Sequence, residues 1–121
     1  MVRFLILFIF IIKTSIYASF SDFGPYDVQV SFGDTSISEN TSIQYTLFKP
    51  LNAPDAPHVL LAHGFLDNQN SMTGFANHYA SWGIKVATMD LLHSSLISND
   101  PFQDAEDLIG LSNQIGAESA V

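Results

Sequence analysis

Two short, continuous apolar runs limit the possible folds of this chain more than any other feature. The runs cover residues 58–62 and 84–90, and such runs are typical of strands that helices cover on both faces of a sheet. Between them, apolar residues recur at helical spacing, Asn70 or Ser71 can cap the helix, and Gly83 can end it. A strand, a helix and a strand of these lengths predict a right-handed parallel crossover. The apolar stripe of the helix comprises Met72, Phe75, Ala76, Tyr79 and Ala80.

An antiparallel pair of strands is predicted before this crossover. Residues 26–32 and 42–48 alternate polar and apolar side chains, which is typical of half-buried strands at the edge of a sheet. The segment between them contains two pairs of residues that favour turns, Gly33-Asp34 and Glu39-Asn40. Residues 49–57 are punctuated by prolines, so we expect a connecting loop there.

A third unit begins at Asp100 and Pro101. Asp100 can cap a helix, Pro101 suits its first position, and the acidic residues that follow lie near the positive end of the helix dipole. The expected buried face of this helix consists of Ala105, Leu108, Ile109 and Ile115. Together the elements predict an α/β fold, in which an antiparallel edge pair is followed by parallel strands with crossover helices.

The N-terminus has the pattern of a signal peptide. Arg3 precedes the apolar run 4–12, and Ile16-Tyr17-Ala18 fits a cleavage site after Ala18. The run is too short to cross a membrane, which needs about 20 residues. We therefore predict a signal peptide over residues 1–18, a secreted or periplasmic protein and no stable membrane anchor, with a lasting anchor as the alternative. Residues 19–121 are expected to form one partial domain.

Charge and composition exclude several classes of partner. After cleavage only two basic residues, Lys49 and Lys85, oppose 12 acidic ones, a formal net charge of −10. Such a surface repels nucleic acid and anionic membranes, and it favours a neutral or cationic substrate. The absence of cysteine excludes disulfides, thiolate metal sites and a cysteine nucleophile. The four histidines share no metal-ligand spacing, so we expect no metal and no cofactor.

The carboxyl ends of the two apolar strands are the expected place for a ligand. The first strand is followed by His63, Gly64, Phe65 and Leu66, and the second by a loop that contains His93. Gly64 allows a turn without a Cβ, so that the backbone N–H of Phe65 is free to donate to an oxyanion. We predict that Gly64, Phe65, Leu66 and His93 contact the substrate. His63 is interpreted as a structural histidine that holds this loop, with a catalytic base as the alternative.

These residues resemble the N-terminal half of α/β-hydrolases. The similar parts are His63-Gly64-Phe65, the helix end Ala80-Ser81-Trp82-Gly83 and the apolar strand that ends at Asp90, within about residues 45–116. The chain is most similar to the branch that contains chlorophyllases, cutinase-like polyester hydrolases and dienelactone hydrolases. With the signal peptide, the resemblance implies an exported serine ester hydrolase that acts through an acyl-enzyme on a small-molecule or polymeric ester. It also implies that the Phe65 N–H is one oxyanion-hole donor and that its ring belongs to the acyl pocket.

The nucleophile of that family has no counterpart at the expected place. Gly110-Leu111-Ser112 begins like Gly-x-Ser-x-Gly, but Gln114 replaces the last glycine and the segment lies in a helical pattern. The family places its serine before the acid and the histidine, so Asp90 is expected to cap or orient the following loop and not to act as a triad acid. We therefore expect an N-terminal fragment, truncated before the nucleophile strand, that lacks the triad and is inactive by itself.

Two functions remain open from the sequence. The first is the leading portion of an exported serine ester hydrolase. The alternative is a non-catalytic secreted remnant or binding protein with an incomplete hydrolase fold. His93 and Ser94 also have two interpretations, because they either touch a substrate or form a solvated pair on the loop.

Overall fold

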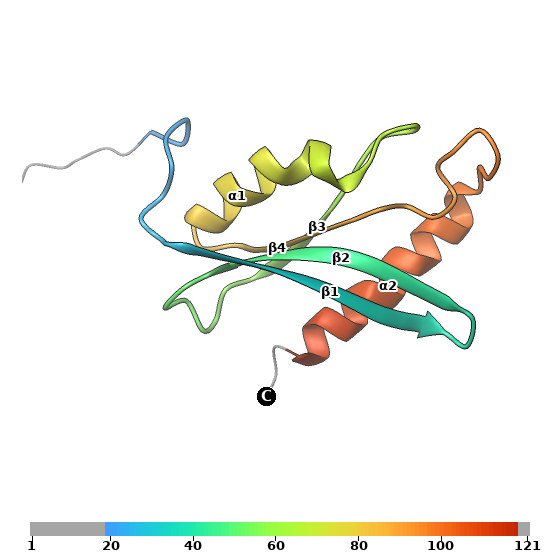
Figure 1. Cartoon of the computed structure of the whole chain (residues 1–121). Helices are drawn as coiled ribbons and strands as arrows, with labels where there is room; N and C mark the ends of the chain where they lie inside the picture. Colours follow the sequence, from blue (N-terminus) through green and yellow to red (C-terminus); the bar gives the residue numbers. More distant parts are fainter. Residues whose placement is uncertain (1–18, 119–121) are drawn as a thin grey trace, which may run out of the picture.

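The computed structural model describes residues 19–118, and the expected signal peptide, residues 1–18, lies outside this range. The described part is a mixed sheet with strand order β1-β2-β4-β3 and with helices on both faces (Figure 1). The prediction of an α/β fold is confirmed at this level. The elements are β1 (Val28–Ser38), β2 (Thr41–Pro50), β3 (His58–Ala62), the 3₁₀ helix η1 (Gln69–Met72), α1 (Thr73–Ser81), β4 (Lys85–Met89) and α2 (Pro101–Glu118).

The sheet has an antiparallel part and a parallel part. β1 pairs with β2 and β2 pairs with β4, both in antiparallel orientation. β3 and β4 are parallel, with His58 opposite Lys85 and Ala62 opposite Met89. β1 and β2 form the predicted antiparallel edge pair. β3, α1 and β4 form the predicted parallel crossover.

Two apolar clusters hold the helices against opposite faces of the sheet. Consecutive residues of a strand point to opposite faces, so Val86 packs toward α1 while Ala87 packs toward α2. The buried cluster under α1 comprises Phe48, Ala76, Ala80 and Val86. The buried cluster under α2 comprises Ile43, Tyr45, Ala87, Met89, Leu111 and Ile115.

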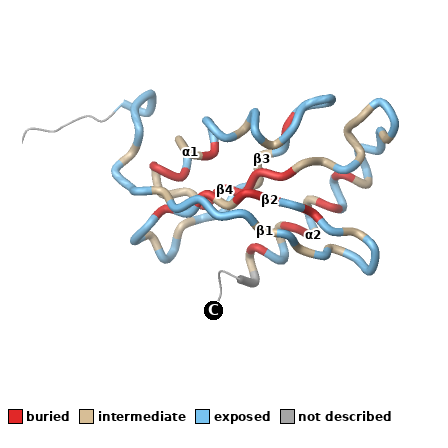
Figure 2. Tube along the Cα trace, in the orientation of Figure 1, coloured by how far each residue is buried: buried red, intermediate tan, exposed pale blue. Residues whose placement is uncertain are grey.

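Burial differs sharply between the two parallel strands (Figure 2). Every residue of β4 is buried, as predicted for a strand covered on both faces. The same prediction was wrong for β3, where His58, Val59 and Ala62 are exposed. β3 is at one edge of the described sheet. The two helices contact mainly the other three strands. An apolar run therefore identified the strand but not its place in the sheet.

The first strand is longer than predicted, and one predicted turn is absent. Gly33 and Asp34 lie inside β1, and the chain turns at Glu39-Asn40. Gly33 lies opposite Tyr45, and a Cβ at Gly33 would lie 2.3 Å from Cζ of the Tyr45 ring. Glycine is present because the ring passes close over the strand, and not because the backbone turns there.

The crossover helix starts earlier than predicted. The side chain of Asn68 accepts a hydrogen bond of 2.9 Å from the N–H of Asn70 and caps η1, which leads directly into α1. The predicted caps Asn70 and Ser71 are therefore wrong, since both lie inside η1. Gly83 follows the helix with a φ of 92°, a conformation that glycine adopts easily, so the predicted helix end is confirmed.

The predicted apolar stripe of α1 is only partly buried. Ala76 and Ala80 are fully buried against the sheet, whereas the ring of Phe75 is 61 % exposed and Tyr79 is 41 % exposed. Small side chains bring the helix close to the sheet, and the larger rings lie beside the contact.

The segment that precedes β1 is attached to the end of α1. The N–H of Gly24 donates to Oγ of Ser81 at 2.8 Å, and Nε1 of Trp82 donates to the carbonyl oxygen of Asp22 at 3.0 Å. The ring of Phe20 lies 4.8 Å from that of Trp82. These contacts fix residues 20–24 against α1.

The start of α2 follows the prediction. Oδ1 of Asp100 accepts hydrogen bonds of 3.1 Å from the N–H groups of Phe102 and Gln103, and Pro101 is the first residue of the helix. Ser112 lies inside the helix, as its sequence context predicts, and not at a turn between a strand and a helix.

The buried face of α2 is rotated from the predicted one. Ala105 is exposed and Ile109 is 64 % exposed, so these two assignments were wrong, whereas Ile115 is buried and Leu108 is half-buried. The buried positions of the described helix are Asp104, Asp107, Leu111 and Ile115. Two buried carboxylates replace the expected apolar residues: Asp104 accepts hydrogen bonds from the loop that precedes the helix, and Asp107 lies 3.7 Å from His93 of that loop.

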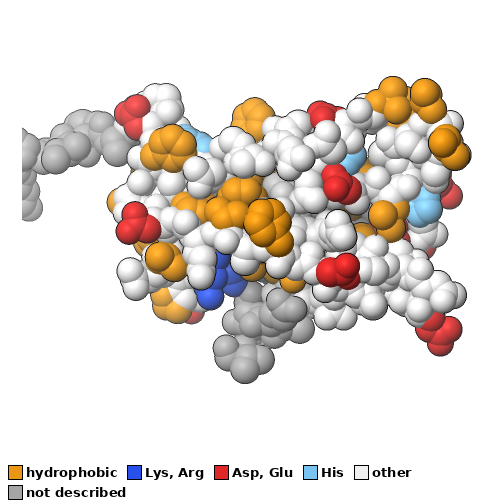
Figure 3. Space-filling model, viewed as in Figure 1, with side chains coloured by type: hydrophobic (Ala, Val, Ile, Leu, Met, Phe, Trp, Pro, Cys, Tyr) orange, Lys and Arg blue, Asp and Glu red, His pale blue; other side chains and the backbone are white. Residues whose placement is uncertain are grey.

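The surface of the described residues is poor in basic groups. Figure 3 shows acidic side chains spread over the visible face and little Lys or Arg. Within residues 19–118, no helix has both the length and the apolar character that crossing a membrane requires.

Candidate functional site

The loops that follow β3 and β4 lie at the same edge of the sheet. The two strands are parallel and end at Ala62 and Met89, which are paired with each other. The N–H of Leu66 donates a hydrogen bond of 3.2 Å to the carbonyl oxygen of Ser94. The structure thus brings the loop of Gly64, Phe65 and Leu66 beside the loop of His93, as the sequence predicts.

Residues 64–67 form a tight turn. The N–H of Asp67 donates to the carbonyl oxygen of Gly64 at 3.1 Å, and Leu66, the third residue of the turn, has a φ of 61°. These features are typical of a type II turn. The turn does not require the glycine at position 64, as had been expected, because Leu66 and not Gly64 adopts the left-handed conformation, and a Cβ at Gly64 would meet no atom within 4 Å.

The backbone of Phe65 carries an available donor. Its N–H donates to no acceptor among residues 19–118, and the residue is 54 % exposed. In a type II turn this is the second residue, whose N–H is not part of the bond that closes the turn. The N–H of Phe65 therefore has no acceptor within the described fold, in a turn at the carboxyl ends of the strands.

His63 fixes the two loops to each other. It is 6 % exposed, and its Nε2 accepts a hydrogen bond of 2.9 Å from the N–H of Leu91. Nδ1 must therefore carry the proton, and it lies 2.8 Å from the carbonyl oxygen of Gly64, to which it donates. Both ring nitrogens are used by the backbone, which is the geometry of a structural histidine.

Asp90 orients the segment before α1. Its Oδ1 accepts from the N–H of Gln69 at 2.8 Å, and its Oδ2 accepts from Nε2 of the same residue at 3.1 Å. The expectation that Asp90 orients the loop after β4 was wrong, because the partner lies on η1, earlier in the chain. The amide oxygen of Gln69 in turn accepts from Oγ1 of Thr46 at 2.9 Å.

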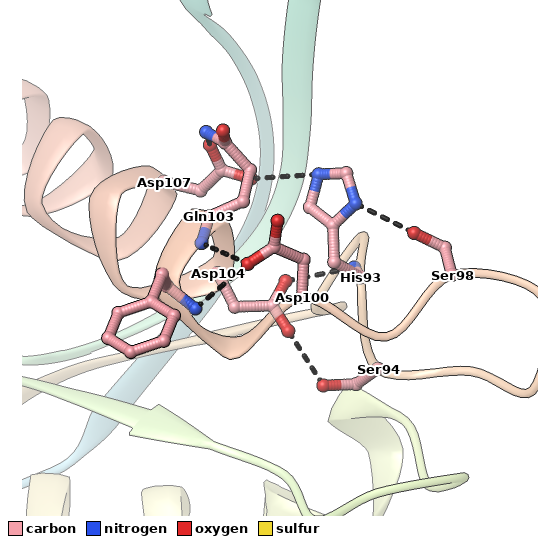
Figure 4. Close-up of polar contacts among 8 residues, drawn as sticks. His93, Ser94, Ser98, Asp100, Gln103, Asp104 and Asp107 are labelled. Carbon is pink, nitrogen blue, oxygen red and sulfur yellow. Dashed lines mark hydrogen bonds and ion pairs between the residues drawn. The ribbon is translucent and has the colours of Figure 1, made fainter.

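His93 and Ser94 are anchored to a buried carboxylate (Figure 4). Asp104 is 5 % exposed, and its Oδ1 accepts from the N–H of His93 at 2.9 Å. Its Oδ2 accepts from Oγ of Ser94 at 2.7 Å. The interpretation of His93 and Ser94 as a solvated pair was therefore wrong, since α2 holds both.

The imidazole of His93 lies between Ser98 and Asp107 (Figure 4). Nδ1 is 2.8 Å from Oγ of Ser98, and Nε2 is 3.7 Å from Oδ2 of Asp107. The other carboxylate oxygen of Asp107 accepts from Nε2 of Gln103 at 3.0 Å. Ser98 and Asp107 were not predicted as site residues. The only signal for them is the spacing of two acids, Asp104 and Asp107, one turn apart on an otherwise apolar helix face.

Asp67 closes the turn that follows β3. The N–H of Asn68 donates to Oδ1 of Asp67 at 2.9 Å, and this bond, with a contribution from the hydroxyl of Ser71, lowers the pKa of the Asp67 carboxyl below its usual range. The carboxylate is fully exposed and stays ionised at neutral pH.

The described residues contain no cluster of three or more His, Asp or Glu side chains that could hold a metal ion. Comparison of the chain with protein-family models and with curated proteins found no match.

Proposed function

We propose that this chain provides the oxyanion-binding edge of an exported serine ester hydrolase, as its N-terminal portion. The observation that supports the proposal most strongly is the N–H of Phe65, which no described residue accepts. It lies in a tight turn at the carboxyl ends of parallel strands, where ligands bind in open α/β sheets. The antiparallel pair followed by a parallel crossover is also the arrangement that the resemblance to α/β-hydrolases implies.

The proposed role of this donor is specific to acyl transfer. When a nucleophile adds to an ester carbonyl, negative charge develops on the oxygen, and a fixed N–H stabilises that charge. The loss of one such donor raises the barrier by about 2.7–4 kcal/mol. Three contacts keep the turn in place: His63 bonds to Gly64, Leu66 bonds to Ser94, and Leu91 bonds to His63. The donor is thus positioned before a substrate arrives.

The surface charge favours a neutral ester. The part of the chain after residue 18 has a formal net charge of −10, so an anionic substrate would approach against a repulsive field. Gly64, Phe65, Leu66 and His93 form the proposed contact surface for a small-molecule or polymeric ester. The exposed ring of Phe65 would contact the acyl chain.

Nuclear magnetic resonance can test the proposal directly. A neutral dialkyl alkylphosphonate has a tetrahedral phosphorus and a strong P=O acceptor, which imitate the intermediate of ester hydrolysis. We expect a saturable downfield shift of the Phe65 amide proton when this compound is added to residues 19–121, with smaller shifts at Gly64 and Leu66. An unchanged Phe65 amide at saturating compound would contradict the proposal.

A further inference from the structure

We propose that Ser98, His93 and Asp107 form a second reactive site, in which Ser98 is a nucleophile toward activated carboxylic esters and related acyl or phosphonyl electrophiles. The site consists of the loop before α2 and one turn of that helix (Figure 4), and it shares only His93 with the contact surface proposed around the turn that contains Phe65. The inference does not depend on the proposed function of that turn.

Asp107 sets the protonation of the imidazole. The side chain of Asp107 is 6 % exposed, and its Oδ2 is buried with no hydrogen-bond partner among the described residues. The ring of His93 presents Nε2 to this oxygen at 3.7 Å. A buried carboxylate oxygen favours an N–H that faces it, so the neutral imidazole carries its proton on Nε2.

This tautomer makes the other nitrogen a base. Nδ1 is then an acceptor, and Oγ of Ser98, at 2.8 Å, donates its hydrogen to it. A nucleophile in contact with a base, and a base oriented by a third group, are the requirements for an activated serine. The two ring nitrogens exchange the roles that they have in the serine protease triad.

The surroundings keep these groups in place. The N–H of His93 is bound by Asp104, its carbonyl oxygen accepts from the N–H of Asp100 at 3.0 Å, and Gln103 holds the second oxygen of Asp107. The N–H of Ser98 donates to Oγ of Ser95 at 3.0 Å. These hydrogen bonds thus hold Ser98, His93 and Asp107 in position relative to one another.

The site is accessible from solvent. The side chain of His93 is 31 % exposed and Ser98 is half-buried. The two residues before Ser98, Leu96 and Ile97, are 82 % and 99 % exposed, and they offer an apolar surface for an acyl or alkyl chain.

Oγ of Ser98 forms a bond to the carbonyl carbon of an ester while its proton moves to Nδ1 of His93. The bond from that carbon to the alcohol oxygen then breaks, and the alcohol leaves with the proton from His93, which gives an acyl-Ser98. With an alkyl fluorophosphonate, the oxygen attacks phosphorus, the P–F bond breaks and fluoride leaves.

The test is covalent labelling of residues 19–121 with a biotinylated alkyl fluorophosphonate, followed by mapping of the label by tandem mass spectrometry. We expect the label on Ser98. His93→Asn keeps an acceptor near Ser98 but no base. It should label at least about 10²-fold more slowly, which is the lower end of the range for general bases. Ser112→Ala, which removes a hydroxyl on α2 far from His93 in the chain, is the matched control and should label at the original rate.

Three results would overturn the inference. These are an absence of label, a label on other residues only, and a Ser98 label that forms equally fast in His93→Asn. Circular dichroism and the melting temperature of each variant show whether the fold is intact, and Asp107→Asn provides an independent variant that should also label slowly. Labelling at Ser98 and phosphonate binding at Phe65 are separate measurements, so either can fail without the other.

Discussion

The N–H of Leu91 donates a hydrogen bond of 2.9 Å to Nε2 of His63, and this contact joins the loops at the ends of β3 and β4. The opposite ring nitrogen donates to the carbonyl oxygen of Gly64. One buried side chain therefore fixes the position of the turn that contains Phe65 relative to the next loop. The position of the Phe65 N–H therefore depends on a buried residue, His63.

Replacement of His63 by alanine should destabilise the fold. The N–H of Leu91 would lose its partner in a partly buried place, and an unsatisfied buried group costs about 1–3 kcal/mol, so we expect a loss toward the lower end of this range. Urea unfolding followed by circular dichroism measures the change. His58→Ala is the control, since His58 is exposed on β3, and its effect should stay within about 0.5 kcal/mol. Equal stability of His63→Ala and the original chain would refute the structural role.

Gly24→Ala should detach the segment before β1 from α1. A Cβ at Gly24 would lie 2.1 Å from the carbonyl oxygen of Ser81, a backbone atom, so the segment must move away. We expect a change in the fluorescence of Trp82, because Phe20 and Asp22 contact its ring. In contrast, a Cβ at Gly74 meets nothing within 4 Å, and Gly74→Ala should stabilise α1 by about 0.5–1 kcal/mol. Unchanged fluorescence in Gly24→Ala would show that the segment is not attached.

Asp104→Ala should release the loop of His93. The variant removes the acceptor of two hydrogen bonds, one from the N–H of His93 and one from Oγ of Ser94, and we expect a loss of about 2–4 kcal/mol. Hydrogen exchange should accelerate at His93 and in the residues that follow it. Glu106→Ala changes an exposed acid on the same helix and should leave the loop protected. Equal hydrogen-exchange rates in the loop of His93 for the two variants would contradict this role of Asp104.

The carboxyl of Asp67 should titrate below the usual aspartate range. Its pKa is lowered first by the hydrogen bond from the N–H of Asn68 and then by the hydroxyl of Ser71. Because the folded state favours the charged form, the stabilisation from this bond is complete above the unfolded pKa and is lost as the pH falls through the folded pKa. The chemical shift of the carboxyl carbon measures the titration. Ser71→Ala should move the pKa upward, and an unchanged or lower value would contradict the assignment.

The sequence predicted those parts of the fold that depend on local patterns. β4 as a buried strand, the cap at Asp100 and the helix end at Gly83 follow from residues that are neighbours in the chain. The exposure of β3 depends on the order of strands in the sheet, which its own residues do not encode. Gly33 was assigned to a turn from its residue type alone. The contact that requires a glycine there is with the ring of Tyr45, which lies on another strand.

The candidate site was predictable in outline only. Parallel strands place the loops of Phe65 and His93 together, and this follows from the βαβ pattern. The contacts of Asp104 and Asp107 with His93 depend on the conformation of the loop between β4 and α2 and on the rotation of α2. The two acids were expected only to lie near the positive end of the helix dipole, and their burial depends on contacts outside the helix pattern: the loop supplies two donors to Asp104, and His93 lies 3.7 Å from Asp107.

Phosphonate binding by Phe65→Pro and Phe65→Ala tests whether the Phe65 N–H donates to a tetrahedral oxygen. Proline is favoured at the second position of a type II turn, so Phe65→Pro removes only the N–H and the ring, while Phe65→Ala removes the ring and keeps the N–H. We expect Phe65→Pro to bind the dialkyl alkylphosphonate roughly threefold to tenfold more weakly than Phe65→Ala, because one hydrogen bond is lost. Equal dissociation constants for the two variants would show that the Phe65 N–H is not a donor to the tetrahedral oxygen.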